Sequence, residues 1–335
     1  VPVLFATALD SQSDVVSAAQ AILAGLPEDP QIDAAILDRA KTNPTNPTNV
    51  RLIAIDLVAQ RRIIAGNPLL FQIADDPDKQ IRIAALDTLG KTGEPADLAN
   101  LVTMLVQRKN AEELRAAENT VKTVAGKAPD KPACTAALLK ALPQAQPEAA
   151  CALLSLLRTT GGPDALQAVR TAAKNNNPQI QETAIRTLCE WPTADAAPDL
   201  LQMAQTAPSD TTKIAALRGY INLIRDPTLA AENKMAIAKQ ATQLVQRDEE
   251  KKLLLGALAE IPAADALAMA VTSLDDPATQ NEAVLAVLAI SEKIAAQKPA
   301  ETAAALQKVL DITKNEDISN RAKAILDNLP KPTEK

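Results

Sequence analysis

A small residue followed four positions later by a larger apolar residue recurs along the chain about every 33 residues. The clear copies are Ala19/Leu23, Ala54/Val58, Ala85/Leu89, Ala117/Val121, Ala184/Leu188, Ala216/Tyr220 and Ala322/Leu326. Blurred copies are Leu153/Leu157, Leu254/Leu258 and Ala283/Val287. Because residues four apart share one face of a helix, the pattern predicts an all-α fold, a solenoid of about ten stacked helical hairpins.

The clearest unit covers residues 75–108. Residues 81–90 have the apolar spacing of an amphipathic helix, which Gly90 and Gly93 are expected to end. Pro95 then opens a second helix. The small residue of the repeated pair has a packing explanation, because neighbouring helices lie about 8–10 Å apart and a small side chain lets their backbones approach.

The turn and first helix of this unit resemble the HEAT repeat, through Asp76, Pro77, Ile81, Arg82, Ala85, Leu89 and Gly90. The resemblance implies a right-handed α–α superhelix whose second helices line the concave side, and by analogy a binding scaffold. It covers most of the chain and weakens around residues 130–160 and 226–262. We expect one solenoid over residues 1–329 and a disordered tail or linker at residues 330–335.

Charge and composition exclude several classes of function. The net charge of −6 and the 1% aromatic content argue against a nucleic-acid partner. No run of 18 apolar residues is present, so we predict no membrane span. The chain contains no histidine, which excludes Ser-His-Asp and Cys-His catalysis and histidine-ligated zinc. We therefore predict no catalytic residue, no cofactor and no metal site.

Two motif-like fragments have simpler structural explanations. Gly90, Lys91 and Thr92 resemble the end of a phosphate-binding loop, but they fall on a predicted helix, where such a loop cannot form. The carboxylates around Asp76 are better explained as helix caps than as a calcium site, because no EF-hand spacing follows. The charge run at residues 248–252 is predicted to be a solvated segment between helices.

Four cations form the first group of candidate partner-binding residues: Arg51, Arg82, Arg115 and Lys213. They occupy similar places at the starts of successive helices. One interpretation is a basic ladder for an acidic partner or a phosphate backbone. The interpretation that we favour is an internal ladder, in which each cation pairs with a turn aspartate. Gln181 occupies the equivalent place in another repeat and interrupts any continuous basic stripe.

Trp191 is the fifth candidate. It is the only tryptophan, directly after a predicted helix, and could serve as a recognition residue or as a cap over a gap between hairpins. The three cysteines Cys134, Cys151 and Cys189 lie at apolar helix positions. We expect buried free thiols there, with one disulfide between neighbouring hairpins as the alternative.

The function that the sequence favours is a monomeric, non-catalytic scaffold that binds a protein along the concave face or an edge. One alternative is an accessory module of a larger exported bacterial protein. That alternative is suggested by the start at Val1 and by a resemblance to arrays on exported proteins, and it favours a bacterial periplasm or exterior over the cytoplasm. HEAT-like DNA glycosylases and bilin lyases are further alternatives, which the charge, the scarce aromatics and the missing histidine disfavour.

Overall fold

The computed structural model describes residues 13–43 and 46–330, with side chains from Ala18 onward. The predicted all-α stack is confirmed, since these residues form helices and turns and include no strand. The predicted tail lies outside the described residues except for Pro330. The chain divides into two compact units, residues 1–184 and 185–335, which are described separately, and the division falls within α12 (Pro178–Cys189).

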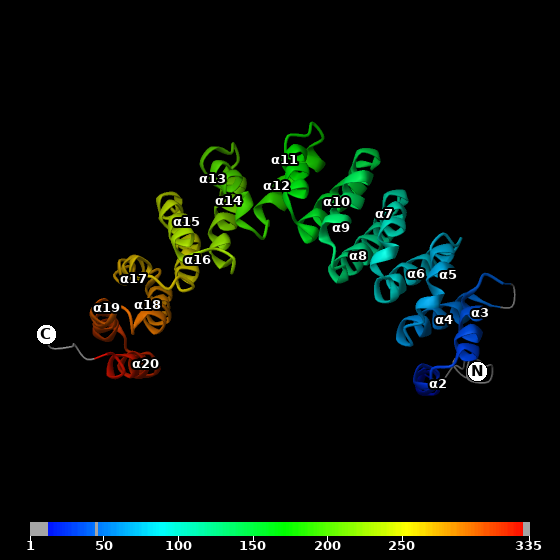
Figure 1. Cartoon of the computed structure of the whole chain (residues 1–335), viewed down its shortest axis with the longest axis horizontal. Helices are drawn as coiled ribbons and strands as arrows, with labels where there is room; N and C mark the ends of the chain where they lie inside the picture. The colour runs from blue at the N-terminus through cyan, green and yellow to red at the C-terminus, as the bar shows by residue number, and fades with distance from the viewer. Residues whose placement is uncertain (1–12, 44–45, 331–335) are drawn as a thin grey trace. The chain divides into compact units, whose positions relative to one another are not determined.

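The first unit is a run of helix pairs (Figure 1). Its helices are α2 (Ser13–Gly25), α3 (Pro30–Ala40), α4 (Thr48–Gln60), α5 (Asn67–Ile73), α6 (Lys79–Thr92), α7 (Leu98–Gln107), α8 (Ala111–Lys127), α9 (Lys131–Ala141), α10 (Pro147–Thr160) and α11 (Pro163–Ala172). The even-numbered helices from α2 to α10 pack against one another in order and form what we call the even row. The odd-numbered helices form the odd row, in which α7 packs on α9 and α9 on α11.

The second unit repeats this arrangement. Its helices are α13 (Ala197–Thr206), α14 (Asp210–Asn222), α15 (Ala231–Leu244), α16 (Asp248–Leu258), α17 (Ala264–Val271), α18 (Gln280–Ile294), α19 (Pro299–Ile312) and α20 (Glu316–Asp327). Its even row runs from α14 through α16 and α18 to α20. Regular helices therefore form in the two regions where the resemblance is weak.

The repeated pair explains the even row. All ten copies fall on even-numbered helices, from α2 to α20. Their side chains are buried, with both Ala54 and Val58 at 0% exposure, for example. The exception is Leu326 on α20, which is half-buried. The repeated pair thus identifies the helices that pack on the preceding and following repeats.

Helix boundaries follow the capping chemistry, with two corrections. The Asp78 carboxylate accepts a hydrogen bond from the backbone N–H of Gln80 and caps α6, as predicted. The prediction that Gly90 ends α6 is wrong, because the helix continues to Thr92 and Gly93 caps it. Gly90 lies inside the helix and faces α8, where a Cβ would make an ordinary van der Waals contact with Thr120, at 3.6 Å.

The frame of the hairpins also differs from the sequence prediction. The unit 75–108 pairs α6 with the helix that follows it, whereas α6 packs much more extensively on the preceding helix, α5. Hence α6 is the second helix of its hairpin. The phosphate-loop alternative is excluded by the same geometry, since Lys91 and Thr92 belong to the last turn of α6 and Thr92 is buried.

Cations bind neighbouring hairpins together at their ends. Arg61, after α4, donates to the carbonyls of Leu23, Ala24, Leu26 and Pro27. Lys127 donates to the Gly90 and Lys91 carbonyls, and Lys293 to that of Ala259. These carbonyls belong to the last turn of a helix in the even row or follow it, where no intrahelical donor remains. Each clamp therefore satisfies the end of the preceding helix in its row.

Candidate functional site

Arg51 is a buried part of the stack. It lies on α4 with 5% exposure, and its Nη2 is 2.5 Å from Oδ2 of Asp76, in the turn between α5 and α6 of the next hairpin. Burial of Asp76 opposes its ionisation, but hydrogen bonds from Arg51, the Asp78 N–H and the Thr42 hydroxyl outweigh burial and hold the pKa of the Asp76 carboxyl below its usual value. The pair joins two hairpins and leaves little of Arg51 accessible to a partner.

Arg82 makes the corresponding link one hairpin later. Its Nη2 lies 2.7 Å from Oε1 of Glu113 on α8. The hydrogen bond to Arg82 holds the pKa of Glu113 below its usual value, against the opposing effect of burial. Arg108 adds a second bridge across the same junction, because it donates to the Ala74 carbonyl at 2.9 Å and to Asp75 at 2.6 Å.

Arg115 and Lys213 are placed differently. Arg115 is exposed on α8 and makes no ion pair with any described residue. It precedes Ala117 by two residues, whereas Arg82 precedes Ala85 by three, and this shift rotates its side chain by about 100° around the helix. Lys213 is half-buried on α14 and pairs only with Asp210 of its own helix, at 3.4 Å. Three of the four cations thus form ion pairs within the stack.

Trp191 is buried, with 4% of its surface exposed, and its indole N–H donates to the Thr193 hydroxyl at 3.1 Å. This placement matches the capping interpretation and leaves little of the ring on the surface. The thiols are free: Cys134 and Cys189 are buried, whereas Cys151 is half-exposed, contrary to the expectation that all three are buried. Desolvation raises the pKa of the Cys189 thiol to about 11, so it is a weak nucleophile.

The charge run at residues 248–252 was assigned incorrectly. It forms the first turn of α16, not a segment between helices. Glu250 is 1% exposed, and its Oε1 lies 2.7 Å from Nη2 of Arg218 on α14. Residues 248–252 contain adjacent carboxylates and lysines, and no periodic pattern in the sequence distinguishes the buried Glu250 from its exposed neighbours.

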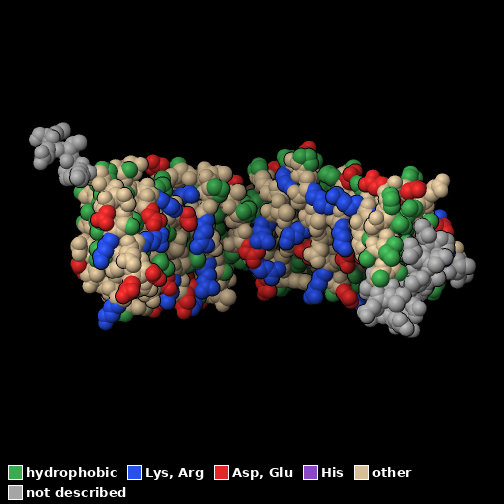
Figure 2. Space-filling model, turned by 90° about the horizontal axis from the view of Figure 1, so that it is seen from below, with side chains coloured by type: hydrophobic (Ala, Val, Ile, Leu, Met, Phe, Trp, Pro, Cys, Tyr) green, Lys and Arg blue, Asp and Glu red, His purple; other side chains and the backbone are tan. Residues whose placement is uncertain are grey.

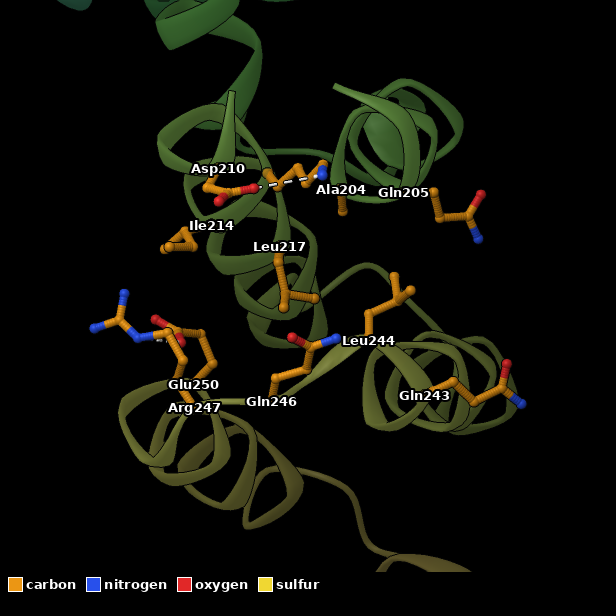
Figure 3. Close-up of a pocket in the computed structure, with 11 residues that line it drawn as sticks. Ala204, Gln205, Asp210, Ile214, Leu217, Gln243, Leu244, Gln246, Arg247 and Glu250 are labelled. Carbon is orange, nitrogen blue, oxygen red and sulfur yellow. Dashed lines mark hydrogen bonds and ion pairs between the residues drawn. The ribbon is translucent and has the colours of Figure 1, made fainter. Parts of the chain in front are cut away.

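A groove at the edge of the second unit contains Lys213 and Glu250. It has a volume of about 430 Å³ and lies where the ends of α13 and α15 meet the starts of α14 and α16. Figure 3 shows Leu217, Leu244 and Gln246 around it. We call it the α13–α16 groove; it is lined by Ala204, Gln205, Asp210, Lys213, Ile214, Leu217, Gln243, Leu244, Gln246, Arg247 and Glu250.

No arginine of the described chain joins the two turns that border this groove. Arg108, nine residues before Ala117, joins the α7–α8 turn to the end of α5. The residue nine before Leu254 is Val245, whose side chain cannot form that bridge. Arg247, two residues later, pairs with Glu249 at 3.1 Å and Glu250 at 3.6 Å instead. No described hydrogen bond or ion pair joins the α13–α14 turn to the α15–α16 turn.

The two rows differ in charge. Helices α5 and α7 of the odd row contain no charged residue, and α13 contains one. On the even row, α6, α8 and α16 contain several each. Figure 2 looks onto the even-row side and shows Lys and Arg side chains with Asp and Glu beside them. The even-row face is therefore charged but of mixed sign, which does not form a continuous basic surface.

The described residues contain no group of His, Cys, Asp or Glu that could hold a metal ion. Among the described helices, none combines the length and the apolar character that crossing a membrane requires.

Comparison with known proteins identifies the family. The profile for HEAT repeats matches residues 34–121 and 135–220, which is more than half of the chain. The chain belongs to the HEAT-repeat family, and the resemblance carried by the Asp-Pro turn and the Arg82/Ala85/Leu89 helix is confirmed. No curated protein sequence matches the chain.

Similar solved structures are long HEAT solenoids. Kap95p with RanGDP matches 97% of this chain and 50% of its own length, with a TM-score of 0.59 and 13% identity. Kap121p bound to Nup53p matches 96% and 40%, with a TM-score of 0.56 and 13% identity. Kap121p bound to the extreme C-terminus of Cdc14p matches 96% and 41%, with a TM-score of 0.54 and 13% identity. The chain thus spans half the length of Kap95p and less than half the length of Kap121p. The similarity shows the fold.

Proposed function

We propose that this protein is a non-catalytic scaffold that binds a protein partner at the edge of its helical stack, in the α13–α16 groove. The observation that carries the proposal is the groove itself, which lies where the α13–α14 and α15–α16 turns share no described hydrogen bond or ion pair. Its volume of about 430 Å³ lies within the range of ligand pockets, and polar and charged side chains surround a smaller apolar set that includes Leu217 and Leu244.

The structural neighbours support a protein partner. Kap95p and Kap121p were solved with protein partners, and one partner is the extreme C-terminus of a phosphatase. These facts belong to those proteins, and at 13% identity they extend to this chain only as part of the proposal. We extend the proposal to a monomer in which residues 1–329 act as one repeat array, without nucleic acid as a partner.

The five candidate residues take different roles in this proposal. Lys213 belongs to the groove wall and contacts the partner, whereas Arg115 offers an unpaired guanidinium on the even row. Arg51 and Arg82 act indirectly, because their ion pairs join neighbouring hairpins, and Trp191 acts indirectly as a buried side chain.

A photocrosslinking residue placed at Gln246 in the groove tests the proposal. Its control stands at Gln202, which is also an exposed glutamine in the second unit but does not line the groove. In an extract of the source cells we expect the Gln246 probe to crosslink one discrete protein and the Gln202 probe not to do so. Equal labelling at both positions, or no protein adduct at Gln246, would contradict a partner site in this groove.

A further inference from the structure

A second groove lies beside the first, at the next junction of the same edge. It has a volume of about 250 Å³ and lies between the α15–α16 turn and the end of α17. We call it the α15–α18 groove after the two hairpins that border it, α15–α16 and α17–α18, although no residue of α18 itself lines it. The lining residues are Thr242, Val245, Lys251, Leu254, Leu255, Leu258, Met269, Thr272, Ser273 and Asp276. Two successive junctions of the second unit are thus open at one edge.

The α15–α16 turn forms the ridge between the two grooves. Leu244 and Gln246 line the α13–α16 groove, whereas Val245 lines the α15–α18 groove. Val245 has an extended backbone, with φ −71° and ψ 120°. Successive side chains of extended backbone point to opposite sides, so these three residues supply both walls of the ridge.

Charges in both grooves are largely compensated within the protein. Lys213 pairs with Asp210, Arg247 with Glu249, and Lys251 with Asp276 at 3.2 Å. Each groove has an apolar floor, formed by residues such as Leu217 in the first and Leu254 in the second. An occupant that carries a strong charge of either sign would find no uncompensated counter-charge there.

Amide groups remain available around the first groove. Gln205, Gln243 and Gln246 are exposed and form no hydrogen bond with other described side chains or backbone groups. Each amide carries an acceptor oxygen and two donor hydrogens. Extended peptide backbone offers the matching pattern of carbonyls and N–H groups, with side chains that can enter the apolar floors.

We propose that the edge of the second unit binds an uncharged peptide segment in the polyproline II conformation, whose apolar side chains at positions i and i+3 enter the two grooves. This inference rests on the proposed protein-binding function. The spacing follows from geometry: neighbouring helices pack about 8–10 Å apart, and a polyproline II chain rises about 3.1 Å per residue with three residues per turn, so side chains three apart share one face. Three residues of such a peptide therefore span one junction, passing over the ridge at Val245.

The test is selection of random 12-residue peptides displayed on phage against the full chain, followed by binding measurements on the enriched peptides. We expect enriched sequences to carry apolar residues three apart. Moving one apolar residue to give i,i+2 or i,i+4 spacing should weaken binding about tenfold, as should Gln246→Trp in the first groove or Thr272→Trp in the second. Gln202→Trp, outside both grooves, should leave affinity unchanged.

Circular dichroism verifies that each variant is folded. The variant Gln246→Ala adds no bulk and should weaken peptide binding, because it removes an amide group. Enriched peptides that bind all groove variants equally, or charged peptides whose affinity falls steeply with salt, would overturn the two-groove inference while leaving a protein-binding role intact. Failure to enrich any peptide, together with the absence of a crosslinked protein at Gln246, would overturn both.

Discussion

Leu244 and Val245 are consecutive residues whose side chains enter two different grooves, one on each side of the α15–α16 turn. The relationship depends on the end of α15 at Leu244, since Val245 then has an extended backbone that turns its side chain away from that of Gln246. It makes this turn the centre of the proposed binding edge. The turn makes no described bond of the kind that Arg108 forms at a junction of the first unit.

The Arg51–Asp76 pair should make the first unit sensitive to acid. The folded-state pKa of Asp76 lies below its value of 3.8 in the unfolded chain, so the pair's contribution is present above about pH 4 and is lost as pH falls through the folded pKa. Asp76→Asn should therefore destabilise the protein at neutral pH, by about 3–5 kcal/mol, because Arg51 stays buried without a carboxylate.

Urea denaturation at several pH values measures this effect. The difference between wild type and Asp76→Asn should shrink as the pH falls below 3.8 toward the folded-state pKa of Asp76, since protonation then gives both proteins an uncharged residue. Asp38→Asn, which changes an exposed carboxylate, should shift stability by less than about 0.5 kcal/mol. A difference that stays constant with pH would show that the ion pair is not responsible.

Arg62 should be a stabilising site for glycine. It has a φ of 54°, in the left-handed region, because it follows α4 in a turn where Ile63 N–H donates to the Val58 carbonyl. Relief of the Cβ clash by Arg62→Gly should stabilise the protein by about 0.5–1 kcal/mol. Arg62→Ala keeps the Cβ and should give no such gain, so equal stabilisation by both variants in thermal denaturation would point to loss of the side chain instead.

Two helical glycines should respond in opposite ways to alanine. A Cβ at Gly219 would collide with the Cys189 carbonyl oxygen, whereas one at Gly256 would meet only the Arg225 guanidinium at 3.7 Å. Gly219→Ala should destabilise by about 1–3 kcal/mol through overpacking, and Gly256→Ala should stabilise by up to about 1 kcal/mol through helix propensity. Chemical denaturation of both variants provides the comparison; similar changes in the two would refute the packing argument.

Trp191→Ala should destabilise the protein by about 3–5 kcal/mol, because it removes a large side chain that is only 4% exposed. Denaturation followed by circular dichroism measures the change. At temperatures where the variant remains folded, affinity for groove-selected peptides should be unaltered, since Trp191 does not line either groove. Lost peptide affinity in a fully folded variant would mean that the ring contributes to binding directly.

The sequence predicted the stack well because its strongest signal, a small residue and a larger apolar one four apart, reports the tightest contacts. Every copy lies on an even-numbered helix, including the weaker copy at Leu254/Leu258. Helix ends were less predictable: Gly90 appears to be a stop in the sequence, but it lies inside α6, beside Thr120 of the next repeat. Such contacts depend on partners about one repeat away.

The candidate site was only partly predictable. Lys213 was singled out because it occupies the same place in its helix as Arg82, yet the two make different contacts. Glu250 was missed, since its burial depends on Arg218 in the preceding repeat. The groove itself was not predicted, because it is formed by the ends of four helices whose side chains are far apart in the sequence.

Because of the cation clamps, the last carbonyls of a helix in the even row depend on a side chain of the next repeat for a hydrogen-bond donor. When the segment that contains Arg61 unfolds, the carbonyls from Leu23 to Pro27 lose their donors, so fraying of one repeat weakens the end of its predecessor. The stability of each repeat therefore depends on whether its neighbours are folded. A ligand that holds one junction closed would transmit protection to adjacent repeats, measurable as slowed amide hydrogen exchange beyond the residues that it touches.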